Sequence, residues 1–160
     1  MIIVARKYWL LKTEPGCFSI DHLASEPNGI AGWDGVRNYQ ARNMLRDDIQ
    51  AGDGVLFYHS SVQPAGIAGI CEVVRDGYPD ETARDPEGEH FDPRATAENP
   101  IWYQVDVQFK SKLPRLLTLP ELRDVPGLEN MMLLQRGSRL SVQPVRPDEW
   151  KIIQRLIRKL

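Results

Sequence analysis

Residues 102–109 read WYQVDVQF, which is the clearest strand signal in the chain. Successive side chains of a strand point to opposite faces, so this alternation predicts a β-strand with one apolar face. The apolar face would carry Tyr103, Val105, Val107 and Phe109, and the other face Trp102, Gln104, Asp106 and Gln108. Trp102 therefore falls on the polar face, where we expect an exposed indole.

Other apolar runs on both sides of this strand predict the rest of a sheet. Residues 8–11, 55–59, 66–74 and 140–145 are short, rich in β-branched or aromatic residues, and bounded by turn signals. Such strands are too short and too irregularly connected for a doubly wound parallel sheet. We expect a mainly β fold with helices, of the α+β class, in which a small β-barrel is surrounded by short helices.

Four helices are expected around this sheet. Ser19 is placed to cap a short helix, and residues 36–49 carry apolar side chains near helical spacing. The pair Thr118 and Glu121 matches a capping box, and Pro147 begins an amphipathic C-terminal helix whose basic face we expect to be solvated. The glycine-rich stretch 26–35 is predicted to be a loop.

Length and composition favour one ordinary globular domain. The 160 residues suit a single domain over 1–160, and the hydrophobic and charged fractions of 42% and 26% exclude disordered and fibrous classes. Cys17 and Cys71 lack disulfide or zinc spacing, which fits a reducing cytoplasm. Arg6 and Lys7 interrupt the N-terminal apolar stretch, so we expect neither an export signal nor a membrane partner.

The charge is unevenly distributed. Residues 76–98 hold eight acidic side chains against Arg84 and Arg94, a local balance of −6 that leaves +4 for the rest of a chain of net charge −2. The stretch of about 76–100 is therefore predicted to be an acidic excursion from a mildly basic body. That body is compatible with a small nucleic-acid contact but not with a long basic groove.

Motifs for catalysis are missing from the sequence. It contains no phosphate-binding loop, nucleophile elbow, zinc-protease or dinucleotide motif. A Cys17 and His59 nucleophile pair is conceivable, although nothing in the sequence brings the two together. His90 lies among acids, where we expect solvated surface. We therefore predict no enzyme, no cofactor and no metal.

The stretch 32–43, GWDGVRNYQARN, carries residue types that read bases. A loop aromatic such as Trp33 can stack on a base, and the amide of Asn38 offers a donor and an acceptor to a base edge. In the alternative interpretation, Trp33 plugs the end of the barrel, Tyr39 packs inward and Asn38 caps the helix. The residue types alone leave both open.

A second candidate group, FYHS, ends the strand 55–59. Alternation would send Tyr58 away from Val55 and Phe57, which leaves Tyr58 and Ser60 available to a pocket. Tyr58 could equally pack beneath the C-terminal helix.

Four segments together resemble the EVE domain family of PUA-like folds: WLLKTEP at 9–15, GWDGVRNYQARN at 32–43, FYHS at 57–60 and RLSVQPV at 139–145. Stand-alone bacterial members of this family are the most similar in organisation. The resemblance covers nearly the whole chain and implies a PUA-like β-barrel whose pocket accepts a flipped-out modified base. For EVE domains the implied ligand is a 5-modified cytosine in DNA.

The resemblance and the residue types together indicate which residues bind. The candidates for base contact are Lys12, Thr13, Ser19, Trp33, Arg37, Asn38, Tyr39, Asn43, Tyr58, His59 and Ser60, and those for phosphate contact are Arg42 and Arg139. A modified RNA remains an alternative partner, and a small-molecule binder or a Cys/His enzyme is a weaker one. We expect the protein to be a monomer.

Overall fold

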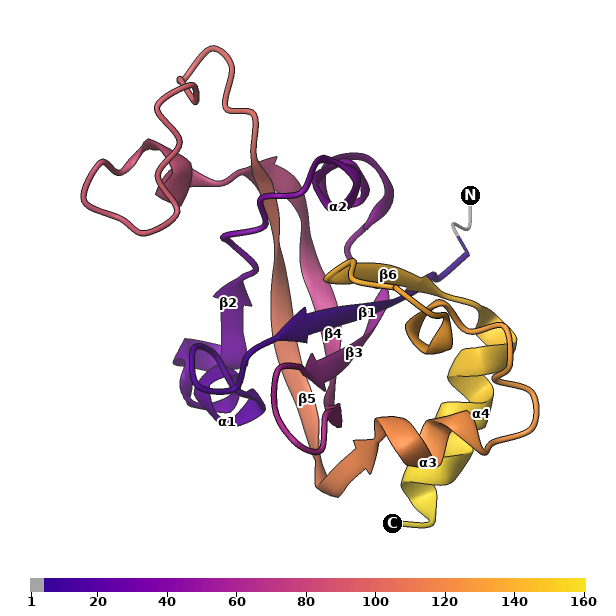
Figure 1. Cartoon of the computed structure of the whole chain (residues 1–160). Coiled ribbons are helices and arrows are strands. Elements are labelled where there is room, and N and C mark those ends of the chain that lie inside the picture. The colour runs from indigo at the N-terminus through magenta and orange to yellow at the C-terminus, as the bar shows by residue number, and fades with distance from the viewer. Residues whose placement is uncertain (1–4) are drawn as a thin grey trace.

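The computed structural model describes residues 5–160 and confirms the α+β class, with one six-stranded sheet and short helices (Figure 1). The strands are β1 (Tyr8–Thr13), β2 (Ile30–Gly32), β3 (Gly54–His59), β4 (Gly66–Pro79), β5 (Tyr103–Thr118) and β6 (Val142–Val145). The helices are α1 (Ile20–Ser25), α2 (Tyr39–Asn43), α3 (Leu119–Arg123) and α4 (Pro147–Arg158). None of the helices within residues 5–160 has both the length and the apolar character to cross a membrane.

The strand order is β2-β5-β4-β3-β1-β6, with β1 parallel to β3 and every other pair antiparallel. Within the described residues β2 and β6 do not pair with each other, so the expectation of a closed barrel is wrong. Both edge strands are short, three and four residues, and Pro144 in β6 has no N–H to donate. The sheet therefore keeps two edges.

The predicted strands are confirmed, but two are longer than expected. β4 continues to Pro79 and β5 to Thr118, and the pair keeps its ladder through several register shifts. A long hairpin satisfies its own backbone groups, so it extends past the apolar core into polar sequence. β2, at 30–32, lies inside the predicted loop because its hydrogen bonds come from β5, far along the chain.

The helices differ more from their sequence signals. The predicted helix 36–49 is in fact the five-residue α2 followed by a π-helical turn, Met44–Asp48. Asn38 caps α2 by accepting the N–H of Ala41 at 2.9 Å. The predicted caps at Ser19 and Thr118 are confirmed, each as a capping box.

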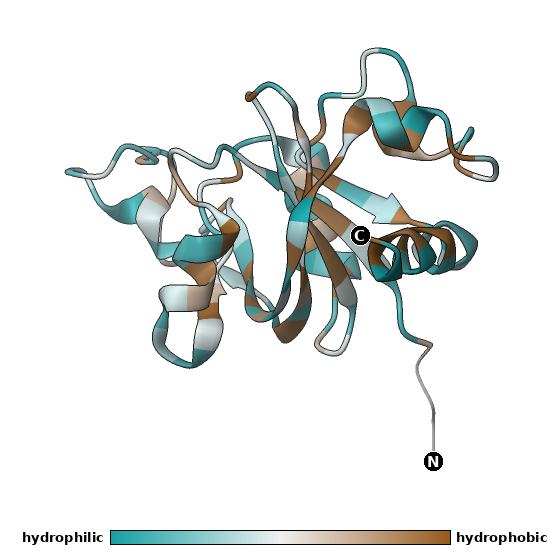
Figure 2. Ribbon diagram, turned by 90° about the horizontal axis from the view of Figure 1, so that it is seen from below, coloured by the Kyte–Doolittle hydropathy of each residue, from teal (hydrophilic) through white to brown (hydrophobic). Residues whose placement is uncertain are grey.

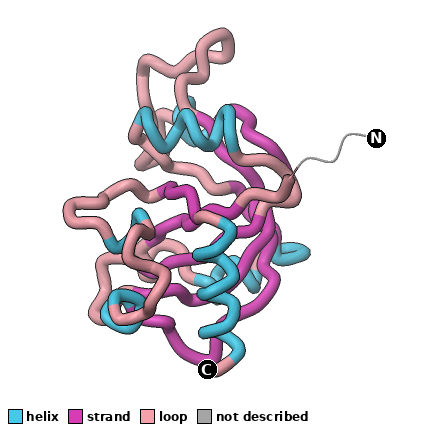
Figure 3. The backbone as a smooth tube through the Cα atoms, turned by 90° about the vertical axis from the view of Figure 1, so that its right-hand side faces the viewer, coloured by secondary structure: helices cyan, strands magenta, loops and turns pink. Residues whose placement is uncertain are grey.

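Apolar side chains form a core on each face of the sheet. One core, cluster 1, contains Trp9, Leu11, Trp33 and Phe57, and the other, cluster 2, contains Leu10, Leu56, Tyr58 and the apolar side of α4. Figure 2 shows the strands as the most hydrophobic segments, and Figure 3 shows α4 running along the outside of the strands.

Trp102 departs from its prediction, since only 3% of the residue is exposed. Its indole N–H donates to Asp92 at 2.8 Å, and the ring of Tyr39 stacks on it at a centroid distance of 4.9 Å. The acidic excursion thus folds back over Trp102, immediately before β5, which alternation within the sequence could not reveal.

A buried carboxylate, Asp53, ties β1 to the start of β3. It is 4% exposed and accepts three N–H groups: from the Trp9 indole at 2.9 Å, from Gln50 at 2.9 Å and from Lys7 at 3.2 Å. Hydrogen bonds to a charged acceptor are stronger than neutral ones, and donors left without a partner in the interior are costly.

Asp53→Ala should therefore lower the free energy of unfolding by roughly 3 kcal/mol, since it removes a charged acceptor and strands a buried indole N–H. Urea denaturation followed by tryptophan fluorescence measures this. The control Asp48→Ala, at an exposed position, should change stability by no more than about 0.5 kcal/mol. Equal effects of the two substitutions would contradict the assigned role.

Candidate nucleic-acid interface

The carboxyl ends of β1 and β3 lie side by side and gather five of the predicted residues. Because the strands are parallel, Lys12 lies beside Tyr58 and Thr13 beside His59. The N–H of Ser60 donates to the carbonyl of Thr13 at 2.9 Å. We call Lys12, Thr13, Tyr58, His59 and Ser60 the strand-end site.

Side-chain alternation divides this site between the two faces of the sheet. Thr13 and His59 share the face of cluster 1, whereas Lys12 and Tyr58 share the face of cluster 2. Tyr58 is 3% exposed and packs in cluster 2 together with Trp150 of α4, which matches the alternative interpretation of its role. Thr13 and His59 are thus the residues of this site on the Trp33 side.

His59 is held by the start of α1. Its Nε2 accepts the backbone N–H of Ile20 at 3.2 Å, while Ser19 caps the same helix. An acceptor nitrogen must be unprotonated, and burial accordingly lowers the pKa of His59 below its ordinary value. The imidazole of His59 is therefore neutral when it accepts the hydrogen bond that orients α1.

Trp33 lies in the core. The residue is 6% exposed, and its ring meets Phe57 edge-on at 5.4 Å and Phe18 edge-on at 6.2 Å. Its backbone N–H donates to Val105 at 2.7 Å. The structure therefore does not show Trp33 as an open aromatic wall. The ring packs inside the protein, as in the alternative interpretation.

Arg37 fastens the acidic excursion to the body of the protein. Its guanidinium pairs with Asp80 at 2.9 Å, and it also donates to Thr82 and to the carbonyl of His90. Burial by itself would raise the pKa of Asp80, but the hydrogen bonds from Thr82, Gly35 and Arg37 outweigh burial and lower it. These bonds engage the guanidinium that the sequence assigned to base contact.

Tyr39 and Arg42 extend this attachment. The ring of Tyr39 stacks on Trp102, and the centre of the Arg42 guanidinium is 5.0 Å from the centre of the tyrosine ring. Arg42 also donates to the carbonyl of Ile101 and to the side chain of Asn43. Tyr39 remains 49% exposed, so the expectation that it packs inward holds for one face of the ring only.

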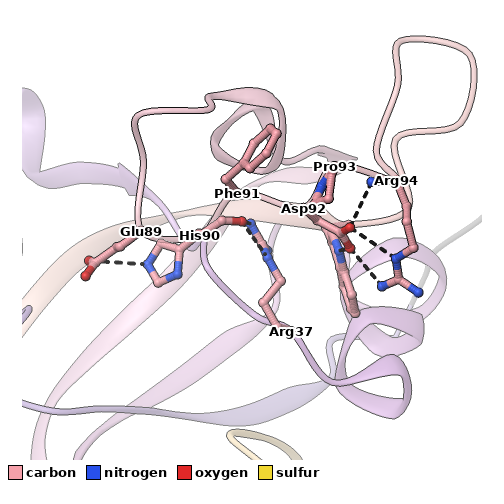
Figure 4. Close-up of a pocket in the computed structure, with 8 residues that line it drawn as sticks. Arg37, Glu89, His90, Phe91, Asp92, Pro93 and Arg94 are labelled. Carbon is pink, nitrogen blue, oxygen red and sulfur yellow. Dashed lines mark hydrogen bonds and ion pairs between the residues drawn. The ribbon is translucent and has the colours of Figure 1, made fainter.

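A cavity of about 330 Å³ lies beside Trp102, and Figure 4 shows the residues that line it. It is lined by Arg37, Glu89, His90, Phe91, Asp92, Pro93, Arg94 and Trp102. Its volume is at the lower end of the range for small-ligand sites. However, Arg37 pairs with Asp80 and Arg94 with Asp92, so an anion would have to compete with bonds inside the protein.

The predicted residues thus form two separate groups. The strand-end site is accompanied by Ser19 and Trp33, while Arg37, Tyr39 and Arg42 belong to the attachment of the acidic excursion. Asn38 caps α2, and Asn43 is exposed.

Sequence reasoning missed two residues near these groups. The first is Phe18, whose ring contacts both Trp33 and Phe57. The second is Asp34, whose pKa is raised mainly by burial and also by the nearby charge of Asp80. Asp34 was within the quoted motif, but only the folded chain brings Asp80 toward it.

Comparisons with known proteins cover nearly the whole chain. A family model described as EVE domain matches residues 7–156. A structure of a hypothetical protein from Leishmania major is 47% identical, with a TM-score of 0.91 over 97% of this chain and 96% of that one. The crystal structure of human THYN1 in complex with 5-methylcytosine containing DNA is 39% identical, with a TM-score of 0.87 over 96% of this chain and 99% of that one.

Thymocyte nuclear protein 1 of Gallus gallus is 40% identical over 163 residues, which cover 91% of this chain and 66% of that protein. This chain therefore spans slightly less than two thirds of the length of that relative.

Trp33→Ala should destabilise the protein by about 3–5 kcal/mol, because it empties a large volume in cluster 1. Urea denaturation is the measurement, with Phe91→Ala as an aromatic control at a position that is 41% exposed. The control should cost about 0.5 kcal/mol or less. A small loss in Trp33→Ala would show that the ring is not part of the core in solution.

The stability of the wild type should fall as the pH decreases from about 7.5 to 5, because the unfolded chain binds a proton at His59 near pH 6.5. The folded state, with its lowered pKa at His59, resists that proton. The contribution of His59 to stability is thus fully present at pH values above its pKa in the unfolded chain. It is lost as the pH falls toward the lower pKa of His59 in the folded protein. His59→Gln, whose amide oxygen can still accept the Ile20 N–H, should show a shallower decline in urea midpoints; parallel profiles would refute this.

Proposed function

The chain belongs to the EVE domain family, and from this membership we propose that it binds nucleic acid and recognises a flipped-out modified base, with 5-modified cytosine in DNA as the leading candidate. The family resemblance seen in the sequence is thereby confirmed. The base identity, the binding mode and the contacting residues are our proposal.

One observation carries this proposal. Human THYN1, which resembles this chain over almost its whole length, has been crystallised with DNA that contains 5-methylcytosine. A TM-score of 0.87 means that the two proteins share the same overall fold. A similar arrangement supports a similar class of ligand.

The strand-end site has the groups that such recognition requires. Thr13 and Ser60 join the two strands through backbone atoms, so the pairing leaves their hydroxyls free for a base edge. Outside this site, at the start of α2, Asn38 uses its oxygen as a cap, which leaves its amide nitrogen as a donor. We propose that Trp33 supports this site from the core and touches the base at its margin.

The energetics limit the expected selectivity. Extruding a base costs a few kcal/mol, which stacking and hydrogen bonds in the pocket must offset. A buried methyl group contributes about 0.8 kcal/mol, so apolar contact alone discriminates 5-methylcytosine from cytosine by roughly fourfold.

We propose binding without catalysis. The Nε2 of His59 is engaged by the Ile20 N–H and is not available as a base toward Cys17. The other thiol, Cys71, is buried in the core, and burial raises its pKa to about 12, which makes it a poor nucleophile.

A modified RNA is the second candidate ligand, since it could use the same strand-end site and would differ by contacts to the 2′-hydroxyl. A monomeric state and a cytoplasmic location also remain proposals based on the sequence. The relative from Gallus gallus is named a nuclear protein, and that name describes the location of the relative only.

The test is a panel of matched DNA and RNA oligonucleotides carrying cytosine, 5-methylcytosine or 5-hydroxymethylcytosine, in single- and double-stranded form. Fluorescence anisotropy should give tighter binding to modified DNA, by about three- to fivefold for the methyl group. Thr13→Val, which keeps the side-chain shape and removes the hydroxyl, should weaken binding to modified DNA by about three- to tenfold.

Ser25→Ala, at an exposed position on α1, serves as the control and should bind as the wild type does. Equal affinity for modified and unmodified DNA would exclude modified-base recognition. Stronger binding to matched RNA would favour the second candidate.

A further inference from the structure

The connection before β6 presents two arginines that have no acidic partner. Arg136 and Arg139 are both exposed, and within residues 5–160 neither forms an ion pair. By contrast, Arg37 and Arg94, near the cavity, are both paired with aspartates. The two unpaired guanidiniums are thus free to bind an anion.

Lys12 adds a third cation beside this connection. Its ammonium is half-buried, donates to the carbonyl of Ser138 at 3.5 Å, and lies 5.8 Å from the centre of the Tyr58 ring. Burial without a carboxylate lowers the pKa of Lys12, because nothing compensates for the lost water. An incoming anion would supply the missing partner.

The connection is held in shape by two glutamines. Gln143, which is 1% exposed, donates to the hydroxyl of Ser138 at 2.9 Å and to the carbonyl of Leu140 at 3.0 Å. Gln135 donates to the carbonyls of Glu129 and Met131 at 2.9 and 3.1 Å. Because the Ser138 hydroxyl accepts from Gln143, its own hydrogen remains available to a ligand.

This connection borders the strand-end site. The backbone N–H of Lys12 donates to the carbonyl of Ser141 at 2.8 Å, and Leu140 packs against cluster 1, which contains Trp33. A nucleotide bound at the strand ends would therefore bring its backbone close to Ser138 and its neighbours.

We propose that Lys12, Arg136, Ser138 and Arg139 form a phosphate seat that grips the nucleic-acid backbone next to the extruded nucleotide. The ligand class is a phosphodiester, and its identity as modified DNA rests on the proposed function. Holding the flanking phosphate fixes the strand while its base leaves the stack, which gives the seat a role in positioning the ligand.

The overall charge distribution also favours binding of the nucleic acid at the connection before β6. The acidic stretch 76–98, with its balance of −6, belongs to a different part of the molecule, attached through Arg37 and Tyr39. Figure 1 shows that this excursion extends beyond the sheet, away from β6. A polyanion is repelled there and attracted to the seat.

The experiment compares Arg136→Gln/Arg139→Gln with Arg155→Gln/Arg158→Gln, a control that removes the same charge from exposed positions on α4. Each protein is titrated with a fluorescent DNA duplex, with and without 5-methylcytosine, at several salt concentrations. The seat variant should bind both duplexes about tenfold more weakly at low salt. Its slope of log affinity against log salt should be smaller by about one to two, while the methylated-to-unmodified ratio stays unchanged.

A seat variant whose affinity and salt slope match those of the α4 control would overturn the phosphate seat and leave base recognition intact. A wild type that does not distinguish the two duplexes would overturn the proposed base recognition. The comparison of the salt slopes of the two double variants would still test the phosphate seat. A wild type that fails to bind either duplex would overturn both. Thermal melts of each variant confirm that the exposed substitutions leave the fold intact.

Discussion

The position of β1 in the sheet is the constraint from which the other features follow. β1 lies between β3 and β6, so both of its backbone edges are paired, and its side chains enter both cores: Trp9 and Leu11 on one face, Leu10 on the other. A strand buried on both faces requires a continuous apolar run, because any polar side chain there would lose its water without compensation. Because β1 and β3 are parallel, the polar residues that follow the two apolar runs lie together at the carboxyl ends of these strands.

The strand-end site is a direct consequence of that pairing. Beyond the apolar runs, the chain no longer needs to fill a core, so hydroxyl, imidazole and ammonium groups can lie beside each other at the ends of β1 and β3. The connection before β6 reaches the same place because β6 pairs with β1, which brings Ser138 within reach of Lys12. The proposed base contact and the proposed phosphate contact are thus adjacent, because both involve residues that hydrogen-bond to β1.

The acidic excursion is attached by a different set of interactions. The Arg37–Asp80 pair and the Arg42–Tyr39–Trp102 stack hold it against β5 and α2. These contacts use Arg37 and Arg42 of the GWDGVRNYQARN segment, for which residue types alone had left a structural role and a nucleic-acid role open. Arg136 and Arg139, which form no ion pair within residues 5–160, lie elsewhere, on a connection where the sequence had marked only Arg139. The distinction is physical: a guanidinium already paired with a carboxylate offers little to a phosphate, whereas an unpaired one offers its full charge.

Short-range signals in the sequence predicted the strands other than β2, the helix caps at Ser19 and Thr118, the C-terminal helix and the family, because each depends on short-range periodicity, local hydrogen bonding or a recognisable motif. The folded chain was needed to establish that the sheet stays open, that Trp33 and Trp102 are buried, and that Arg37 is paired while Arg136 forms no ion pair within residues 5–160. Those outcomes depend on which distant segments meet: Trp33 is buried by Phe57 on β3, and Arg37 is neutralised by Asp80 across the fold. Burial and ion pairing are properties of such contacts, and residue spacing along the chain does not encode them.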